Sequence, residues 1–499
     1  MAAEFDGPQA CNCLQLITID FRETIPDNHP VRFIDQFVEN ISVTVFEEKY
    51  KVGCGLKGRA PKDVRLMLKI ILYAIYCRIY SARKIDYATE HYADFWFFTH
   101  QQRISHDKIS DFIVMHGDDL HTVFLETVSL AHTNDLLSFD ALYQDGFKVK
   151  ANASKQKNYT HKGLSKKEQK LSENLTEVIE QLKDRNDDES LIKEKKKLQG
   201  KLLQIRDLRD ELEKRIATRS ERKSEAKKQE VAKKTVINTT DPDSEFMKQK
   251  DDGNANSYLK ITGIDNKADI IISSTVAGHD HESIHSLPLF NQANMHLDEI
   301  NSAQKYDKAI GDSGFTQMGA CDEFEKNDAQ LIGPTKEYEI QNRHHKNNDS
   351  KITFHYDEKT NTVTCSEDTI LTQTGTHYRK ERDVHVNRYT NKAACQKCLR
   401  LKECTKSDNG FRRVEIDPRM AATQRTLEKY CSEEGQSLYK KRSHVAETFQ
   451  GDLKGNGRFV QFLLRGLGKV IIESTLHDIV WNLRRIITVT SETAVVWST

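Results

Sequence analysis

The sequence contains no long apolar segment and no recognisable export signal. None of its hydrophobic runs approaches the roughly 18 to 20 residues needed to cross a bilayer. The first ten residues, MAAEFDGPQA, lack the basic and then hydrophobic pattern of a signal peptide. These absences exclude a membrane protein of the usual kind, so we expect a soluble, cytoplasmic protein without a membrane partner.

The chain also lacks net charge, because 75 basic and 75 acidic residues give a formal value of +0. The two signs are unevenly distributed along the chain, so neutrality does not exclude a nucleic-acid partner. Ten cysteines in a cytosolic protein favour free thiols or metal ligands over disulfides. At 499 residues the chain exceeds the size at which single cores stop growing, which indicates several domains.

Residues 1–135 predict a helical domain with a cationic surface. Apolar residues recur at helical spacing in PKDVRLMLKIILYAIY, and Ser81 and Ser105 are suitable N-caps. A compact basic helical unit is typical of a helix-turn-helix DNA reader, although an ordinary solvated helix face explains the same cations. These cations are Arg59, Lys62, Arg65, Lys69, Arg78, Arg83, Lys84, Arg103 and Lys108.

From residue 136 the pattern changes to short strands, predicted in LLSFDALYQ, FKVKA, SYLKITGID and ADIIISSTVAG. Residues 164–235 interrupt this sheet. Their apolar residues at steps of three, four and seven predict a coiled-coil hairpin that reverses at Asn186–Asp188. Cations in its second half could follow phosphates, but we favour a spacer or a dimer contact.

A second interruption, residues 333–420, is rich in cysteine. CQKCLRLKEC brings Cys395, Cys398 and Cys404 together, and Cys365 lies upstream. Four thiolates suffice for a closed tetrahedral Zn²⁺ site, whereas the alternative is a set of reduced cysteines in a loop. The spacing leaves both interpretations open.

Three carboxylates lie in segments suited to phosphodiester chemistry. Asp145 ends LYQD before Gly146, where we expect a tight reversal into FKVKA, and Asp312 ends YDKAIGD. Glu447 lies in the basic helical segment YKKRSHVAETFQGDLK, where a regular helix would place Lys454 two turns away on the same face. Paired metals about 3.5 to 4 Å apart need oxygen ligands of this kind. Taken singly, each acid is more often a cap or surface residue.

Other candidates rank lower. Asp140 lacks a following glycine, and Asp265 in GIDNK is more simply a turn residue. His279, His281 and His285 in GHDHESIH look like a metal cluster but have no second ligand group nearby, so we favour a polar loop.

Several of these segments resemble bacterial insertion-sequence transposases of the DDE type. They are DGFKVKANAS, TDPDSEFM, GDSGF, CQKCLRLKEC and YKKRSHVAETFQGDLKGNGRFVQFLLRGLGKVIIESTLHDIVWNLRR. NHPVRFIDQFVENI and SARKIDYATEHYADFWFFTHQQRISHDKISDF resemble the helical domain that precedes the catalytic core in that family. The resemblance extends over residues 17–487.

The resemblance implies a mixed α+β or α/β fold, in which an RNase H-like core carries two insertions and follows an all-helical domain. The predicted parts are 1–135 (helical DNA-binding domain), 136–163 and 236–332 (first parts of the core), 164–235 (coiled-coil hairpin), 333–420 (cysteine-rich insertion with a possible zinc knuckle) and 421–499 (C-terminal part of the core).

The same resemblance implies an enzyme that cleaves DNA at the element ends and joins the 3′ hydroxyls to target DNA. Asp145, Asp312 and Glu447 would be catalytic and would hold Mg²⁺ or Mn²⁺. The partners would be double-stranded DNA and a second copy of the chain, in the cytoplasm at the nucleoid. DNA contacts fall on Tyr439, Arg442, Lys454, Arg458 and Arg465.

This sequence departs from the family pattern around the glutamate. Four residues separate Arg442 from Glu447 where relatives often have three, and TFQG replaces a proline and phenylalanine pattern.

Two other functions stay open. A catalytically inactive DNA-binding protein derived from a transposase would share every feature except the metal chemistry, and the tail ITVTSETAVVWST fits a frameshifted or truncated copy. A coiled-coil zinc adaptor explains the hairpin and the knuckle but gives the segment around Glu447 no role.

Overall fold

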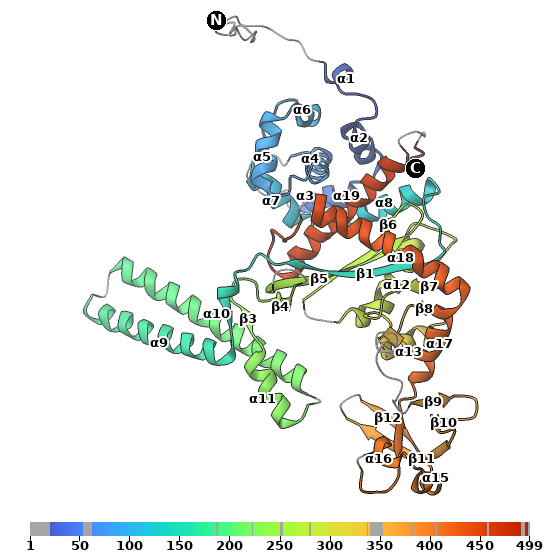
Figure 1. The fold of residues 1–499 in the computed structure, drawn as a ribbon. Helices are drawn as coiled ribbons and strands as arrows, with labels where there is room; N and C mark the ends of the chain where they lie inside the picture. Colours follow the sequence, from blue (N-terminus) through green and yellow to red (C-terminus); the bar gives the residue numbers. More distant parts are fainter. Residues whose placement is uncertain are drawn as a thin grey trace, which may run out of the picture. The chain divides into compact units, whose positions relative to one another are not determined.

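The computed structural model describes residues 20–52, 62–185, 188–221, 223–249, 253–278, 281–336, 338–339, 353–380, 383–405, 407–456, 459–490 and 495–497. Two compact units divide between Phe112 and Ile113 (Figure 1). We predicted a helical domain to residue 135, but α8 (Leu120–Thr133) packs on α19 (Leu467–Val489) in the second unit. None of the described helices is long and apolar enough to cross a membrane.

The described part of the first unit is helical, as predicted. Ser81 caps α5 as expected, because its Oγ accepts the N–H of Lys84. Several predicted surface cations neutralise carboxylates of the same unit, as Lys69 does with Asp35 at 2.6 Å. Arg59 lies outside the described residues. The helices are α1 (Phe21–Thr24), α2 (Pro30–Asn40), α3 (Thr44–Val52), α4 (Val64–Tyr76), α5 (Ala82–His91), α6 (Ala93–Thr99) and α7 (His106–Met115), which crosses the boundary.

The second unit contains a six-stranded sheet in the order β4-β5-β1-β7-β8, with β6 also paired to β5. Strands β4, β1 and β6 all run antiparallel to β5, whereas β7 and β8 continue the sheet in parallel from β1. The strands are β1 (Leu142–Lys150), β4 (Glu245–Lys248), β5 (Asn254–Asp265), β6 (Ile270–Ala277), β7 (Lys308–Ile310) and β8 (Gln330–Ile332).

Strand β1 is continuous, so the predicted reversal at Gly146 is wrong. Leu142–Lys150 pairs residue by residue with Asp265–Ser257 of β5, and Gly146 faces Ile261 in this ladder. The long partner strand supplies hydrogen bonds on both sides of Gly146, which removes any need for a turn there. The parallel pairing with β7 involves Leu142 and Tyr143, just before Asp145.

Alternate residues of β1 face two different helices. Tyr143 Oη donates to the Leu438 carbonyl of α18 (Glu433–Gly451) at 3.2 Å, and the Phe147 and Phe449 rings lie 5.7 Å apart. Gln144 instead bonds to α12 (Glu282–Glu299). Asp145 therefore faces α18, and Gly146 faces α12. Helices α13 (Met318–Lys326) and α17 (Met420–Cys431) complete this part of the unit.

Helices α9 (His161–Asp184) and α10 (Glu189–Ser220) pack against each other as a hairpin, followed by α11 (Glu225–Lys234). The short strands β2 (Asn158–Tyr159) and β3 (Ile237–Asn238) pair at its base. The expected turn residues Asn186 and Asp187 lie outside the described residues, and coiled-coil packing stays a prediction. A buried cluster joins the two long helices and contains Leu164, Ile205, Leu208, Leu212 and Ile237.

The cysteine-rich segment forms an antiparallel sheet in the order β13-β12-β11-β10-β9. Val363, Leu371, Tyr389 and Ile416 form its small buried core. The elements are β9 (Phe354–Asp357), β10 (Thr362–Cys365), β11 (Ile370–Arg379), β12 (Val384–Thr390), α15 (Lys392–Lys397), α16 (Leu401–Cys404) and β13 (Arg413–Ile416).

A buried ion pair joins the sheet to α19. Lys260 of β5 donates to Asp478 at 2.6 Å and to Ser474 at 2.5 Å, and both charged side chains are 1% exposed. We expect Lys260→Met to destabilise the protein by about 3 to 5 kcal/mol, because it leaves a buried carboxylate without its cation. Lys260→Met with Asp478→Leu should recover most of this loss. Urea unfolding measures both effects.

The matched control is Lys267→Met, which breaks a surface pair with Asp135 and should cost less than about 1 kcal/mol. If Lys260→Met and Lys267→Met unfold at the same urea concentration, the buried pair does not hold α19 to the sheet.

Candidate active site

Asp145 and Asp312 lie 167 positions apart in the sequence, and the structure brings them together around one guanidinium. Nη2 of Arg442 donates to Asp145 Oδ1 at 2.7 Å and to Asp312 Oδ2 at 3.2 Å. The side chains of Arg442 and Asp145 are 15% and 12% exposed, so solvent screens this charge only partly. The two carboxylates therefore share one donor atom.

Asp312 reaches this point because β7 ends two residues earlier, at Ile310. Its Oδ1 accepts the N–H of Gly314 at 2.8 Å, and its main-chain carbonyl accepts the N–H of Phe315 at 3.0 Å. The side chain and backbone thus fix the turn that follows the strand. The prediction that Asp312 follows a strand end is confirmed.

Glu282 is a third carboxylate at this place, which the sequence reasoning missed. It opens α12, and its carboxylate lies against Gly146 and Gly314. Burial raises the pKa of Glu282 to about 7, and the negative charges of Asp312 and Asp145 add to this effect. In the segment GHDHESIH the histidines looked like metal ligands. The signal that could have indicated Glu282 was an acid at the start of a helix that follows a buried strand.

Helix α18 carries the remaining predicted acid. Glu447 lies within α18, two residues after the buried Val445, but its side chain lies outside the described residues. The α-helix ends at Gly451 and continues as a π-helix over Asp452–Asn456. The predicted regular helix from Glu447 to Lys454 is therefore wrong, because a π-helix changes the angle between successive side chains.

The predicted DNA-contacting residues fall into two groups. Tyr439 lies one turn before Arg442 on α18, and its ring packs on Tyr430 at 5.0 Å. Burial raises the pKa of the Tyr439 phenol. The charge of Arg442 lowers this pKa and the charge of Asp312 raises it, so the phenol lies near the acidic cluster. The side chain of Lys454 and all of Arg458 lie outside the described residues.

Arg465 belongs to the loop that precedes α19. Its Nε donates to the Asn152 carbonyl at 2.9 Å, just beyond β1. The buried Glu473 accepts the N–H groups of Leu463 and Leu464 at 2.9 Å, which fixes the same loop. An exposed cation is thereby held on an ordered segment at the far end of β1 from Tyr143.

The lower-ranked acids have other roles. Asp265 is buried and accepts hydrogen bonds from the Ser138 N–H at 3.0 Å and the Tyr306 hydroxyl at 2.8 Å, so it organises the entry to β1. Asp140 pairs with Lys441 at 3.2 Å on the surface. His279 lies outside the described residues, whereas His285 lies in α12, so the expected polar loop is partly helix.

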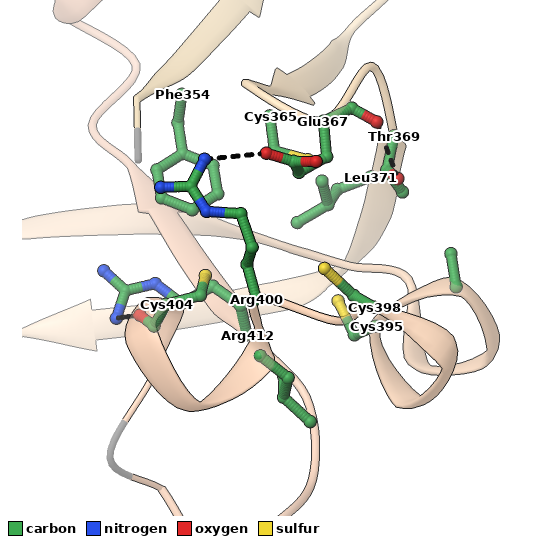
Figure 2. Close-up of a pocket in the computed structure, with 12 residues that line it drawn as sticks. Phe354, Cys365, Glu367, Thr369, Leu371, Cys395, Cys398, Arg400, Cys404 and Arg412 are labelled. Carbon is green, nitrogen blue, oxygen red and sulfur yellow. Dashed lines mark hydrogen bonds and ion pairs between the residues drawn. The ribbon is translucent and has the colours of Figure 1, made fainter. Parts of the chain in front are cut away.

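The four cysteines of the predicted knuckle line one pocket (Figure 2). Cys365 ends β10, Cys395 and Cys398 lie at the end of α15, and Cys404 ends α16. Burial raises the pKa of Cys404, Arg412 lowers it, and the other three thiols raise it again, which places all four in one electrostatic neighbourhood.

Neither candidate centre has the geometry of a closed metal site. Among the residues that the structure describes, no group of three or more His, Cys, Asp or Glu side chains is arranged to hold an ion. Around the acids, the Arg442 guanidinium lies where a cation would bind. Around the thiols, the four donors line one pocket. Both donor sets nevertheless match their metals: hard oxygens suit Mg²⁺ and thiolates suit Zn²⁺.

The helical first unit, the mixed sheet and the paired aspartates next to α18 are the parts expected of a DDE-type transposase. Residues 19–114 match a family described as "Transposase domain (DUF772)", and residues 364–487 match a family described as "Transposase DDE domain". These two matches indicate an insertion-sequence transposase of the DDE type with a helical N-terminal region. A search of curated proteins found no match.

The two matched segments contain different parts of the predicted machinery. The C-terminal segment includes Glu447, Arg442 and the four cysteines, whereas Asp145 and Asp312 lie between the two segments. The assignment of these two aspartates therefore depends on the geometry around Arg442.

Replacing Arg442 tests that geometry in the absence of metal. We expect Arg442→Met to lower the stability of the metal-free protein by about 1 to 2 kcal/mol, because Asp145 and Asp312 lose the cation they share. Mg²⁺ should stabilise this variant more than it stabilises the wild type. Thermal unfolding with and without Mg²⁺ measures both effects.

Lys441→Met is the control, since the neighbouring Lys441 pairs with the exposed Asp140 and its loss should change stability by less than about 1 kcal/mol. An Arg442→Met variant as stable as this control, with no added response to Mg²⁺, would show that the two aspartates do not depend on Arg442.

Proposed function

We propose that the protein cleaves DNA at the ends of an insertion sequence and joins the freed 3′ hydroxyls to target DNA. This proposal rests on one observation: Asp145 and Asp312 lie together next to α18, the helix that contains Glu447. A sheet in which β1, β4 and β6 run antiparallel to β5, and in which β7 and β8 continue in parallel from β1, supports an RNase H-like core. No covalent link between protein and DNA is required.

Asp145, Asp312 and Glu447 would hold Mg²⁺ or Mn²⁺. When bound, the metal would activate the attacking oxygen and stabilise the charge on the leaving oxygen. The Arg442 guanidinium already neutralises the two aspartates, so it must release at least one of them when an ion binds. The released guanidinium would then be available to a DNA phosphate, which is the role the family resemblance gives it.

The other cations would position the DNA. Arg465 lies on the loop fixed by Glu473, and Lys454 and Arg458 lie in the same stretch between α18 and α19. Phosphate contacts of this kind set the register of the duplex without reading its sequence. End recognition would fall to the helical first unit, and pairing of the two ends to a homodimer.

The first experiment measures cleavage of a supercoiled plasmid that carries the element ends, with Mg²⁺ or Mn²⁺. Asp145→Ala, Asp312→Ala and Glu447→Gln should each abolish cleavage, because each removes a proposed metal ligand. Binding to a duplex of the element end should stay close to that of the wild type, because the first unit is unchanged.

The matched control is Asp140→Ala, which removes a nearby exposed acid and should leave cleavage intact. Unimpaired cleavage in any of the three active-site variants, or loss of DNA binding in all of them, contradicts the proposed roles. A wild-type protein that binds the ends without cutting them would instead fit the inactive DNA-binding alternative.

The cysteine-rich segment is proposed to hold a structural Zn²⁺ through Cys365, Cys395, Cys398 and Cys404. Four thiols that line one pocket next to a small hydrophobic core match the number and type of donors in a structural zinc site. The metal would supply folding energy to a segment with little apolar core of its own.

Metal analysis of the purified protein tests the zinc proposal. We expect about one Zn²⁺ per chain, lost in Cys395→Ser and Cys398→Ser because a four-ligand site tolerates few missing donors. Cys431→Ser, which changes an exposed cysteine of α17, should keep its zinc. Wild-type protein that is folded, free of zinc and fully alkylated at the four thiols would contradict this proposal.

A further inference from the structure

The Glu282 carboxylate occupies a slot that two glycines leave open. A methyl group added to Gly146 would lie 2.6 Å from Glu282 Oε1, and one added to Gly314 would lie 2.5 Å from Glu282 Oε2. These contacts are closer than van der Waals packing allows, so only glycine fits at either position while the carboxylate stays in place. The glycine that the sequence suggested as a turn residue thus has a different role in β1.

The first turn of α12 is fixed against β1. Gln144 Nε2 donates to the Ser286 carbonyl at 2.7 Å, and Ser286 Oγ donates to Gln144 Oε1 at 2.5 Å. Because residues four apart share a helix face, Glu282 lies on the same side of α12 as Ser286. The position of Glu282 is therefore set by two buried hydrogen bonds one turn away.

Glu282 lies near the oxygen of Asp312 that Arg442 does not bind. Asp312 Oδ2 accepts a hydrogen bond from Arg442. A methyl group added to Gly314 would lie 2.9 Å from the other oxygen, Asp312 Oδ1, and 2.5 Å from Glu282 Oε2. The two oxygens of Asp312 thus face two different carboxylates, Asp145 on the α18 side and Glu282 on the α12 side. A carboxylate shared in this way is the arrangement needed by two neighbouring cations.

Arg442 and Lys148 offset the negative charge of Glu282 only through space. Among the described residues, the structure shows no hydrogen bond or ion pair to its carboxylate, although the group is half-buried next to Asp145 and Asp312. Burying an acid without a partner beside like charges is unfavourable, and a bound cation would remove the cost.

We propose that Glu282 is a metal-ligating carboxylate of the catalytic centre, which holds a second divalent cation together with Asp312. This inference rests on the proposed function, because it adds a ligand to the same centre. It also explains why residues 146 and 314 are glycines.

The test is a titration of the full-length, metal-free protein with Mn²⁺, with and without element-end DNA. Calorimetry or the magnetic resonance signal of free Mn²⁺ measures the binding. Glu282→Gln should weaken one of two Mn²⁺ sites at least about tenfold, since even outer residues of a metal site contribute that much. Glu299→Gln makes the same change at the exposed end of α12 and should leave both sites unchanged.

Thermal unfolding of the metal-free variants separates a ligand from a structural residue. Glu282→Gln should unfold at the same temperature as the wild type or higher, because it removes repulsion among three acids. A lower unfolding temperature, or two Mn²⁺ affinities equal to those of the wild type, would overturn the inference.

Gly146→Ala gives an independent variant, because its methyl group would displace the flexible end of Glu282 and leave the side chain of Asp145 in place. It should weaken the same Mn²⁺ site, and it should add little to Glu282→Ala, since the two changes act through one group. Full additivity of the two would overturn the inference.

The experiments distinguish failure of this inference from failure of the proposed function. If Asp145→Ala and Asp312→Ala lose cleavage while Glu282→Gln keeps both Mn²⁺ sites and cleavage, only the role of Glu282 fails. If both aspartate variants still cleave, the proposed function itself fails.

Discussion

The candidate active site depends on a balance of charge between several acids and one arginine. Asp145 lies in β1, Asp312 follows the end of β7, Glu282 opens α12, and Arg442 lies in α18. Like charges this close repel, so the strands and helices can meet here only if cations offset the repulsion. In the metal-free protein Arg442 forms ion pairs with two of the acids, whereas Arg442 and Lys148 act on Glu282 only through space.

The position of this centre follows from the sheet. Strand β7 pairs with β1 only as far as Tyr143 and then turns, so Asp145 lies beside the place where its neighbour strand has ended. The alternation of β1 directs Asp145 toward α18 and Gly146 toward α12. Two helices can therefore bring side chains to the same short stretch of strand from opposite faces, which a single helix could not do.

Sequence reasoning identified those parts of the structure that leave a local signal. Helical periodicity, the N-cap Ser81, the strands in SYLKITGID and ADIIISSTVAG, and the strand end before Asp312 are all present. Gly146 was misread because a glycine within a strand has the same local signature as a turn glycine. Only the register with β5 shows that the chain continues straight through it. Glu282 was missed because tertiary packing brings it close to Asp312, and no sequence spacing links the two residues.

The same distinction applies to Arg442. Its sequence context, next to Glu447 in a basic helix, indicated a residue that contacts DNA, and the structure shows it bound to two aspartates. The two acids use only Nη2, and the five N–H donors of a guanidinium allow Arg442 to contact a phosphate through its other nitrogens. If a metal replaces Arg442 between the acids, the positive charge displaced from the centre moves toward the DNA. Metal binding and phosphate binding at this site would then favour each other through the same side chain.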